Sequence, residues 1–156
     1  MYKRQDFARS IGVTAASAAP AIERTAARVA GVLSISGLLL ESASFPERLA
    51  DDHAQAIEQG RRLVDVQREL HGVSHAELCG HLLAMWGLPA DVVTAAAGAW
   101  YSPQRQSGAG RDLATAVQLG RIATTERLES TTHRDIDIDE LTGRLINELS
   151  GGEQAA

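Results

Sequence analysis

The chain has 156 residues, of which 44% are hydrophobic and 22% charged, as expected of a globular domain that buries a core. Its formal net charge of −5 argues against a nucleic-acid-binding surface, which needs clustered Lys and Arg. A single cysteine excludes an intramolecular disulfide, no signal peptide is evident, and the longest apolar run, Val29 to Leu40, is too short to span a membrane. We therefore expect one cytoplasmic domain that binds neither nucleic acid nor a membrane.

Apolar residues recur at helical spacing along the chain, which predicts an all-α helical bundle. The first helix carries an apolar face made by Phe7, Ile11, Ala15 and Ala18. A second begins near Pro20, and its apolar stripe runs through Leu33 into "SISGLLLES". A third starts at Pro46, a residue favoured in a first helical turn, and ends at Gly60.

Local signals also place the helices in the second half of the chain. The segment "RRLVDVQRELHG" is a short helix closed by Gly72. Ser74 and Glu77 form an S-x-x-E capping box, so the next helix begins there, and it ends at Gly87. Pro89 opens the helix after it.

The last third of the chain is predicted as a loop followed by two helices. Residues 102–110 are rich in Gly, Ser and Pro, which predicts the loop. The first of the two helices has a face made by Leu113, Ala116, Val117, Gly120 and Ala123. The second has Asp137 as its N-cap and an apolar face made by Ile138, Leu141, Leu145 and Leu149.

The stretch "GVSHAELCGHLLAMWGLP" raises the question of a metal site, because it holds two histidines and the only cysteine. His75 and Cys79 share one helix face with Leu78, Leu82 and Trp86, whereas His81 points away. A zinc site needs three or four ligands, and His53 and His71 show no ligand spacing. Periodicity therefore favours His75 as a core histidine and Cys79 as a small buried hydrophobe.

A longer stretch carries a family resemblance. "RELHGVSHAELCGHLLAMWGLPADVVTAAAGAWYSP" resembles the C-terminal part of an HDOD domain, the output-domain branch of the HD metal-dependent phosphohydrolase superfamily. "VAGVLSISGLLLESASFPERLA" and "DLATAVQLGRIA" are similar to the segments before and after it. The resemblance covers residues 6–128 and implies an HDOD helical bundle that is incomplete at its N-terminus. The residues at matching positions of the family motif are His75, Glu77, Trp86, Gly87, Pro89 and Pro103.

The same resemblance implies that the metal ligands are missing. In HD phosphohydrolases an adjacent His and Asp bind the metal, and other histidines complete the shell. The corresponding positions here are Arg9, Ser34, Ile35, Trp100 and Tyr101. None of these side chains binds a divalent metal at neutral pH. We therefore expect no metal, no cofactor and no catalysis; His75 is not one of the family's ligands and is expected to hold helix to helix.

Two interpretations of Trp100 and Tyr101 stay open. They fill the space left by the absent metal, or they form part of a protein-binding patch, since Trp and Tyr are preferred interface anchors. Trp86 is expected to pack in the structure where Gly87 turns the chain. The charged run in residues 45–62 is expected to be a solvated helix face, with a docking role as the alternative.

The resemblance implies a non-catalytic signalling module, the output part of a bacterial response regulator in a two-component system. Its expected partner is protein, with an upstream receiver domain in a longer chain, and a homo-oligomer is a further option. The alternative is a metal-dependent phosphohydrolase acting on cyclic dinucleotides with ligands from other positions. A structural remnant with no partner is a third option.

The two ends of the chain are set apart from the domain. Residues 1–5, "MYKRQ", are polar and unpatterned, and back-translated as GTG-TAT-AAG-AGA-CAG they look like a sequencing adapter. We expect them to be non-native and the native protein to extend further upstream. Residues 129–156 are expected to hold a C-terminal helix and a disordered tail.

Overall fold

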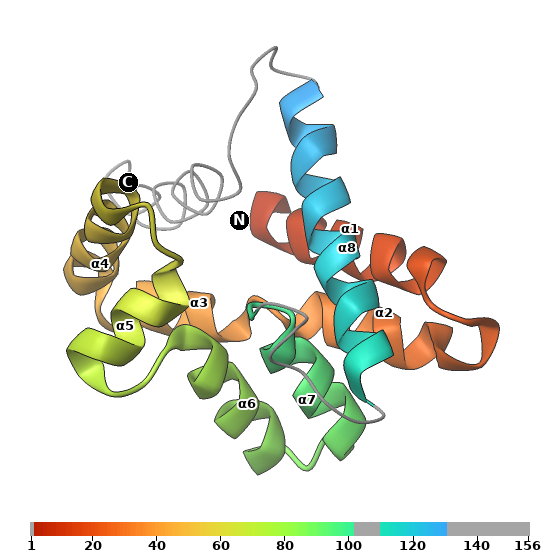
Figure 1. The fold of residues 1–156 in the computed structure, drawn as a ribbon. Helices are drawn as coiled ribbons and strands as arrows, with labels where there is room; N and C mark the ends of the chain where they lie inside the picture. The colour runs from red at the N-terminus through yellow and green to blue at the C-terminus, as the bar shows by residue number, and fades with distance from the viewer. Residues whose placement is uncertain (1, 102–109, 131–156) are drawn as a thin grey trace.

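The computed structural model describes residues 2–101 and 110–130, and these form helices and no strand (Figure 1). In chain order the elements are α1 (Tyr2–Ala18), the short 3-10 helix η1 (Ala21–Glu23), α2 (Arg24–Leu33), α3 (Ser36–Ser44), α4 (Pro46–Gln59), α5 (Leu63–His71), α6 (His75–Met85), α7 (Ala90–Gly98) and α8 (Gly110–Ser130). The all-α prediction is confirmed. The predicted loop at 102–109, including Pro103, and the predicted helix at 137–149 lie outside the described residues.

Helix ends follow the local signals in the sequence. Pro46 occupies the first turn of α4, and α4 ends at Gly60. Helix α5 ends at Gly72, whose φ of 75° lies in the left-handed region that glycine adopts without strain. The Ser74 hydroxyl accepts the backbone N–H of Glu77 at 3.4 Å, and the Glu77 carboxylate accepts the Ser74 N–H at 2.9 Å. The predicted capping box at the start of α6 is therefore confirmed.

The apolar stripe predicted to run on from residue 33 is broken into two helices. The Ser34 hydroxyl donates to the Gly31 carbonyl at 2.8 Å, and the Ser36 hydroxyl donates to the Leu33 carbonyl at 2.7 Å. Serine hydroxyls that bind nearby carbonyls compete with the helical hydrogen bonds of the backbone. Ser34 and Ile35 consequently form a junction between α2 and α3.

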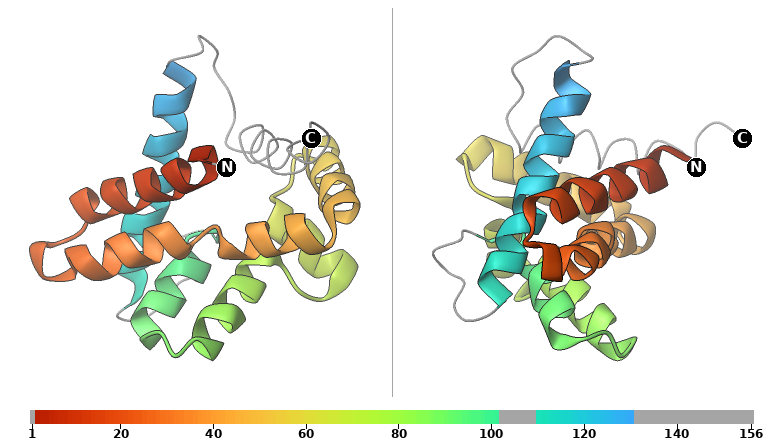
Figure 2. Two further views of the ribbon diagram at one scale, coloured as in Figure 1. Left: turned by 180° about the vertical axis from the view of Figure 1, so that it is seen from behind. Right: turned by 90° about the vertical axis from the view of Figure 1, so that its right-hand side faces the viewer.

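This junction lies near the centre of the molecule. Helices α2 and α3 follow one another across the middle, with α6 and α7 on one side and α4 and α5 at one end (Figures 1 and 2). Helix α1 packs against α2 and α8, α3 packs against α6, and α7 packs against both α6 and α8. One core cluster joins α1, α2, α6, α7 and α8, and a second joins α1, α3, α4, α5 and α6 together with Trp100.

Several helix pairs meet backbone to backbone at a glycine. A Cβ built on Gly31 would lie 2.8 Å from the Cα of Gly12, which fixes the contact of α2 with α1. A Cβ on Gly120 of α8 would lie 2.7 Å from the backbone nitrogen of Ala15. A Cβ on Gly37 of α3 would overlap the backbone carbonyl of His75. These contacts are tighter than any larger residue permits, so glycine sets how closely the helices approach.

One stretch passes the length and composition criteria for a membrane span, contrary to the expectation from sequence. Within the 21 residues Arg24–Ser44, an 18-residue window reaches a mean hydropathy of 1.3. Half of that window is buried inside the structure, where α2 and α3 supply core residues such as Ala30 and Leu38. A core helix of a soluble protein passes the same criteria, so the stretch is weak evidence of a membrane span.

Candidate functional site

The α2–α3 junction meets the end of α7, and this contact brings together three of the residues that the sequence resemblance aligned with metal ligands of HD phosphohydrolases. Trp100 follows α7, and its indole Nε1–H donates to the Ser34 carbonyl at 2.7 Å. Ser34 and Ile35 are 0% and 1% exposed, and Trp100 is 9% exposed. The three residues therefore belong to the packed interior, although Trp100 is 65 or more residues from Ser34 and Ile35 in the chain.

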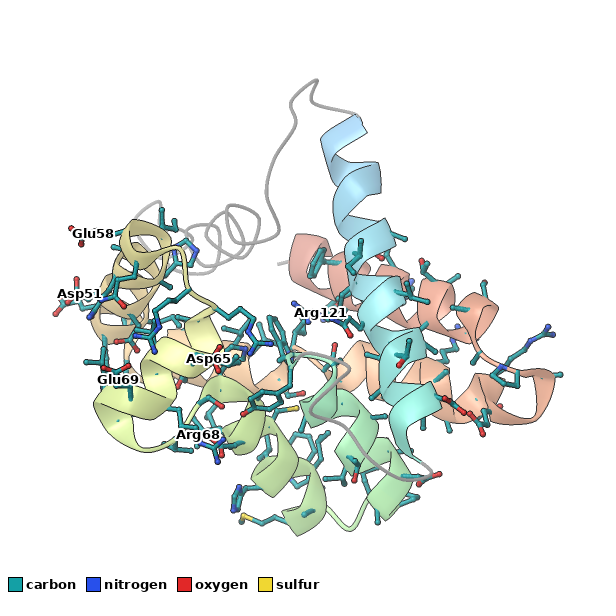
Figure 3. The ribbon with its side chains drawn as sticks, in the orientation of Figure 1. Asp51, Glu58, Asp65, Arg68, Glu69 and Arg121 are labelled. Atoms are coloured by element: carbon teal, nitrogen blue, oxygen red, sulfur yellow. The ribbon has the colours of Figure 1, made fainter. Side chains whose placement is uncertain are left out.

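Arg121 and His75 enclose the Trp100 indole. The Arg121 guanidinium carbon lies 3.4 Å from the centre of the Trp100 ring, and its Nη1 donates to the Ala99 carbonyl at 2.7 Å. Figure 3 shows Arg121 directed from α8 towards the middle of the molecule. The His75 ring meets Trp100 edge-to-face, with ring centroids 4.4 Å apart. Both contacts are favourable, because the face of an indole attracts a cation and aromatic rings prefer perpendicular pairs. No spacing signal in the sequence linked Arg121 to this site.

His75 lies in the core, as the helix periodicity indicated. The Gln67 side-chain oxygen accepts both the His75 backbone N–H at 3.0 Å and the His75 Nδ1–H at 2.7 Å. Full burial lowers the pKa of His75 to about 3, with a smaller contribution from the positive charge of Arg121. The imidazole is therefore neutral at physiological pH, and it joins α6 to α5.

Tyr101 connects the end of α7 to the start of α6. Its hydroxyl lies 2.9 Å from the Ser74 hydroxyl, and burial raises its pKa. Ser74 binds Glu77 through the capping box, and Glu77 pairs with Arg68 at 2.9 Å. The half-buried phenol thus stabilises the α6 N-terminus from a neighbouring segment.

Comparison with protein-family models gave a match to the HDOD domain over residues 5–101. The chain belongs to the HDOD family. The match ends at Tyr101, so α8, with Arg121, lies beyond the matched part of this HDOD domain. Comparisons with curated proteins and with solved structures gave no match.

The side chains that the resemblance aligned with the HD metal ligands do not fit a divalent metal. Ser34, Ile35 and Trp100 supply no carboxylate or imidazole, and Arg9 is exposed on α1. In the described part of the chain no three His, Cys, Asp or Glu side chains are grouped so that they could hold an ion. The Nε2 atom of His75 is buried without a hydrogen-bond partner among the described residues, but one nitrogen is far short of a metal shell.

A polar chain that sequence reasoning missed extends from His75 towards the surface. Gln67 donates from its side-chain nitrogen to the Glu41 carboxylate at 2.6 Å, and Arg48 lies 3.7 Å from the same carboxylate. Desolvation raises the pKa of Glu41, although the Gln67 hydrogen bond and the Arg48 charge oppose that rise. Glu41 and Gln67 are 26 residues apart, so no local pattern pairs them.

Cys79, His71 and His81, which the sequence also raised as possible metal ligands, each have a contact elsewhere in the structure. Cys79 is buried, its thiol donates to the Leu33 carbonyl at 3.4 Å, and burial raises its pKa to about 11. His71 lies 2.9 Å from the Asp52 carboxylate, and His81 Nδ1 lies 2.8 Å from the Glu77 carbonyl. None of these contacts brings the histidines to one point.

The expected packing of Trp86 is wrong. Trp86 is 62% exposed, and the buried face of α6 consists of His75, Ala76, Cys79 and Leu83. The sequence predicted a buried stripe that included Leu82 and Trp86. The observed face is rotated from that stripe, because α6 packs against both α3 and α7. Gly87 turns the chain with φ 75°, and Leu88 packs against the core in place of Trp86. Pro89 is the exposed N-cap of α7.

Proposed function

We propose that this HDOD domain is a non-catalytic signalling module, the output domain of a bacterial regulator, and that it acts by binding a protein partner. The observation that carries the proposal is the Trp100 indole, which donates to the Ser34 carbonyl; the resemblance aligns both residues with metal ligands of HD phosphohydrolases. An enzyme of that superfamily needs the metal to activate water and polarise the phosphoester. A site filled by packed, apolar side chains favours a role in which the fold presents a surface.

The alternative is a metal-dependent phosphohydrolase that acts on cyclic dinucleotides with ligands from other positions. One observation favours it, namely the buried Nε2 of His75 without a partner among the described residues. A nitrogen lone pair in a protein interior is a suitable ligand, but the ion would need two or three more.

The partner in this proposal is a receiver domain upstream in a longer chain, and phosphorylation of that domain would change how the two meet. This part rests on family membership and not on a contact in the structure. Its test is titration of the HDOD domain with a receiver domain encoded in the same gene, with and without a beryllofluoride phosphate mimic. Binding that differs between the two states is expected; affinity that is the same in both would contradict the regulated contact.

The test between the two functions uses the purified 156-residue chain. The chain is incubated with Mn²⁺, Fe²⁺ or Mg²⁺, dialysed, and assayed for bound metal and for hydrolysis of a cyclic dinucleotide. We expect metal far below one ion per chain and no turnover. Stoichiometric metal together with turnover would refute the non-catalytic proposal.

Two histidine variants identify the source of any metal that is found. His75→Asn removes the buried nitrogen, and His81→Asn removes an exposed histidine of the same helix. Metal that is lost in His75→Asn and kept in His81→Asn would assign the ion to the core. Metal that is kept in His75→Asn and lost in His81→Asn would show surface binding, which leaves the non-catalytic proposal standing.

A further inference from the structure

The turn between α6 and α7 carries two adjacent, highly exposed hydrophobic residues. Met85 is 83% exposed and Trp86 is 62% exposed, more than any other large hydrophobic residue in the described part. The turn lies at the edge of the molecule in all three ribbon views, with no other helix covering it (Figures 1 and 2). An exposed pair of this kind marks an interaction surface more often than a single exposed residue does.

The surface around this pair is nearly free of charge. Residues 78–98 contain one acidic residue, Asp91, one histidine, His81, and no Lys or Arg, although 22% of the whole chain is charged. The exposed residues next to the pair are Ala84, Gly87, Pro89 and Ala90. Aromatic residues and methionine with few charges are the composition of a protein–protein interface centre.

The contrast with the rest of the surface is clear. Figure 3 labels charged side chains on α4 and α5, among them Asp51, Glu58 and Glu69. The two next most exposed large hydrophobic residues of the described part, Phe45 and Ile57, lie beside charges: the Arg48 guanidinium is 4.2 Å from the Phe45 ring, and Ile57 precedes Glu58. Only the α6–α7 turn combines two large apolar side chains with an uncharged surround within the described residues.

We propose that the α6–α7 turn is a homodimer interface, in which two copies of this chain meet around Met85 and Trp86. Each copy has a formal net charge of −5, so two copies repel one another across their acidic surfaces. Repulsion is weakest at the surface that lacks charge, and there apolar area is available to bury.

The two flanking polar residues fit a two-fold contact. His81 lies five residues before Trp86 and Asp91 five residues after it, and both are exposed. When the two turns run antiparallel in a two-fold interface, a residue before the turn in one copy faces a residue after the turn in the other copy. His81 of one copy then approaches Asp91 of the second copy, and neither residue meets its own kind. Such pairing at the rim favours the symmetric dimer over a like-charged contact.

This inference goes beyond the proposed function, since a dimer could serve a signalling module or an enzyme equally. It is tested by sedimentation velocity of the 156-residue chain over a range of concentrations. We expect a concentration-dependent monomer–dimer equilibrium. Dimerisation should also shift the fluorescence of Trp86 to shorter wavelength, whereas Trp100 is already buried.

Three variants locate the interface. Trp86→Ala should weaken dimerisation by roughly 30-fold or more, as expected for the central Trp of an interface. Met85→Glu should weaken it as strongly, because two added carboxylates would meet at the two-fold axis. Ile57→Ala removes a comparably exposed hydrophobic residue, 53% exposed on α4, and should leave dimerisation unchanged.

Circular dichroism of each variant checks that the fold is kept, as expected for substitutions at exposed positions. Two results would overturn the proposal. One is a monomer at every concentration, in which case the exposed pair would serve a different partner. The other is a dimer that forms equally well in Trp86→Ala and Met85→Glu.

Discussion

Gly37 is the position where a single methyl group should disturb the HDOD domain most. It lies on α3, and a Cβ there would overlap the His75 carbonyl oxygen, with the His75 carbonyl carbon at 2.8 Å and the Cys79 nitrogen at 3.1 Å. All three atoms are backbone atoms of α6, so no rotamer change can relieve the clash. In Gly37→Ala, α3 and α6 must therefore move apart.

The size of the effect follows from two opposing contributions. Overpacking a core typically destabilises by about 1–3 kcal/mol, and a backbone-to-backbone clash belongs at the upper end of that range. Alanine in a helix interior is about 1 kcal/mol more favourable than glycine, which offsets part of the loss. We expect Gly37→Ala to lower the free energy of unfolding by about 2 kcal/mol.

Gly80→Ala is the matched control, since Gly80 is a glycine of α6 that faces α7. A Cβ there would lie 3.4 Å from the Cβ of Ala97, an ordinary contact. The helix-propensity gain should then dominate, and Gly80→Ala should be neutral or stabilise by up to about 1 kcal/mol. Urea unfolding followed by circular dichroism measures both variants against the parent chain. If the free energy of unfolding of Gly37→Ala lies within about 0.5 kcal/mol of the parent, the reasoning is refuted, because changes that small are typical of surface substitutions without a clash.

Three further predictions concern the core around Trp100. Trp100→Phe removes the Nε1–H donor of the Ser34 carbonyl and should destabilise by about 1–3 kcal/mol in the same urea assay; an unchanged midpoint would mean that water replaces the donor. Because the pKa of His75 is lowered to about 3 from 6.5, the unfolded chain binds a proton that the folded chain does not between these pH values. The free energy of unfolding should therefore fall by up to about 1.4 kcal/mol per pH unit as the pH drops from 6.5 towards 3, and the fall should be shallower in His75→Asn; equal pH slopes would contradict this. The Cys79 thiol, with its pKa raised to about 11, should react with a thiol reagent at pH 7.5 only as fast as the chain unfolds, and rapid labelling of the native protein would show that it is accessible.

Sequence reasoning placed most helix ends well, because those signals are local. Gly60 and Gly72 end helices through a backbone conformation that suits glycine, and Ser74 with Glu77 caps the start of α6 within one turn. The broken stripe at Ser34 was missed, although two serines near each other are a local signal for competing hydrogen bonds. Local chemistry therefore predicts the elements, and a closer look at serine would have predicted their division.

The packing of the helices against one another was harder to predict from the sequence. Trp100 and Ser34 are bonded across 66 residues, and Arg121 reaches Ala99 across 22, so neither contact leaves a periodic trace. The prediction for Trp86 failed because periodicity gives a stripe about one helix and not the number of helices packed against it. Helix α6 contacts both α3 and α7, which shifts its buried face towards Leu83.

The contacts of Trp100 and Arg121 have one physical role in common, and it bears on where a partner can bind. The last carbonyls of a helix lack intrahelical donors and need others. Ser34 is the C-cap of α2 and Ala99 is the C-cap of α7. Their carbonyls accept hydrogen bonds from Trp100 and Arg121 respectively, and a cation is also favourable at a helix C-terminus.

A partner that used Trp100 as its anchor would therefore have to remove the donor from a buried carbonyl at the α2–α3 junction. The unpaired carbonyl alone would oppose binding by about 1–3 kcal/mol, and the loss of the Arg121 contact over the ring would add to that penalty. Burying Trp86 against a partner would break no such core contact, since it is 62% exposed and its side chain lies outside the core. Of the two tryptophans, Trp100 thus stabilises the C-terminal end of α2 against the end of α7. Trp86 is the one whose burial by another chain would release free energy.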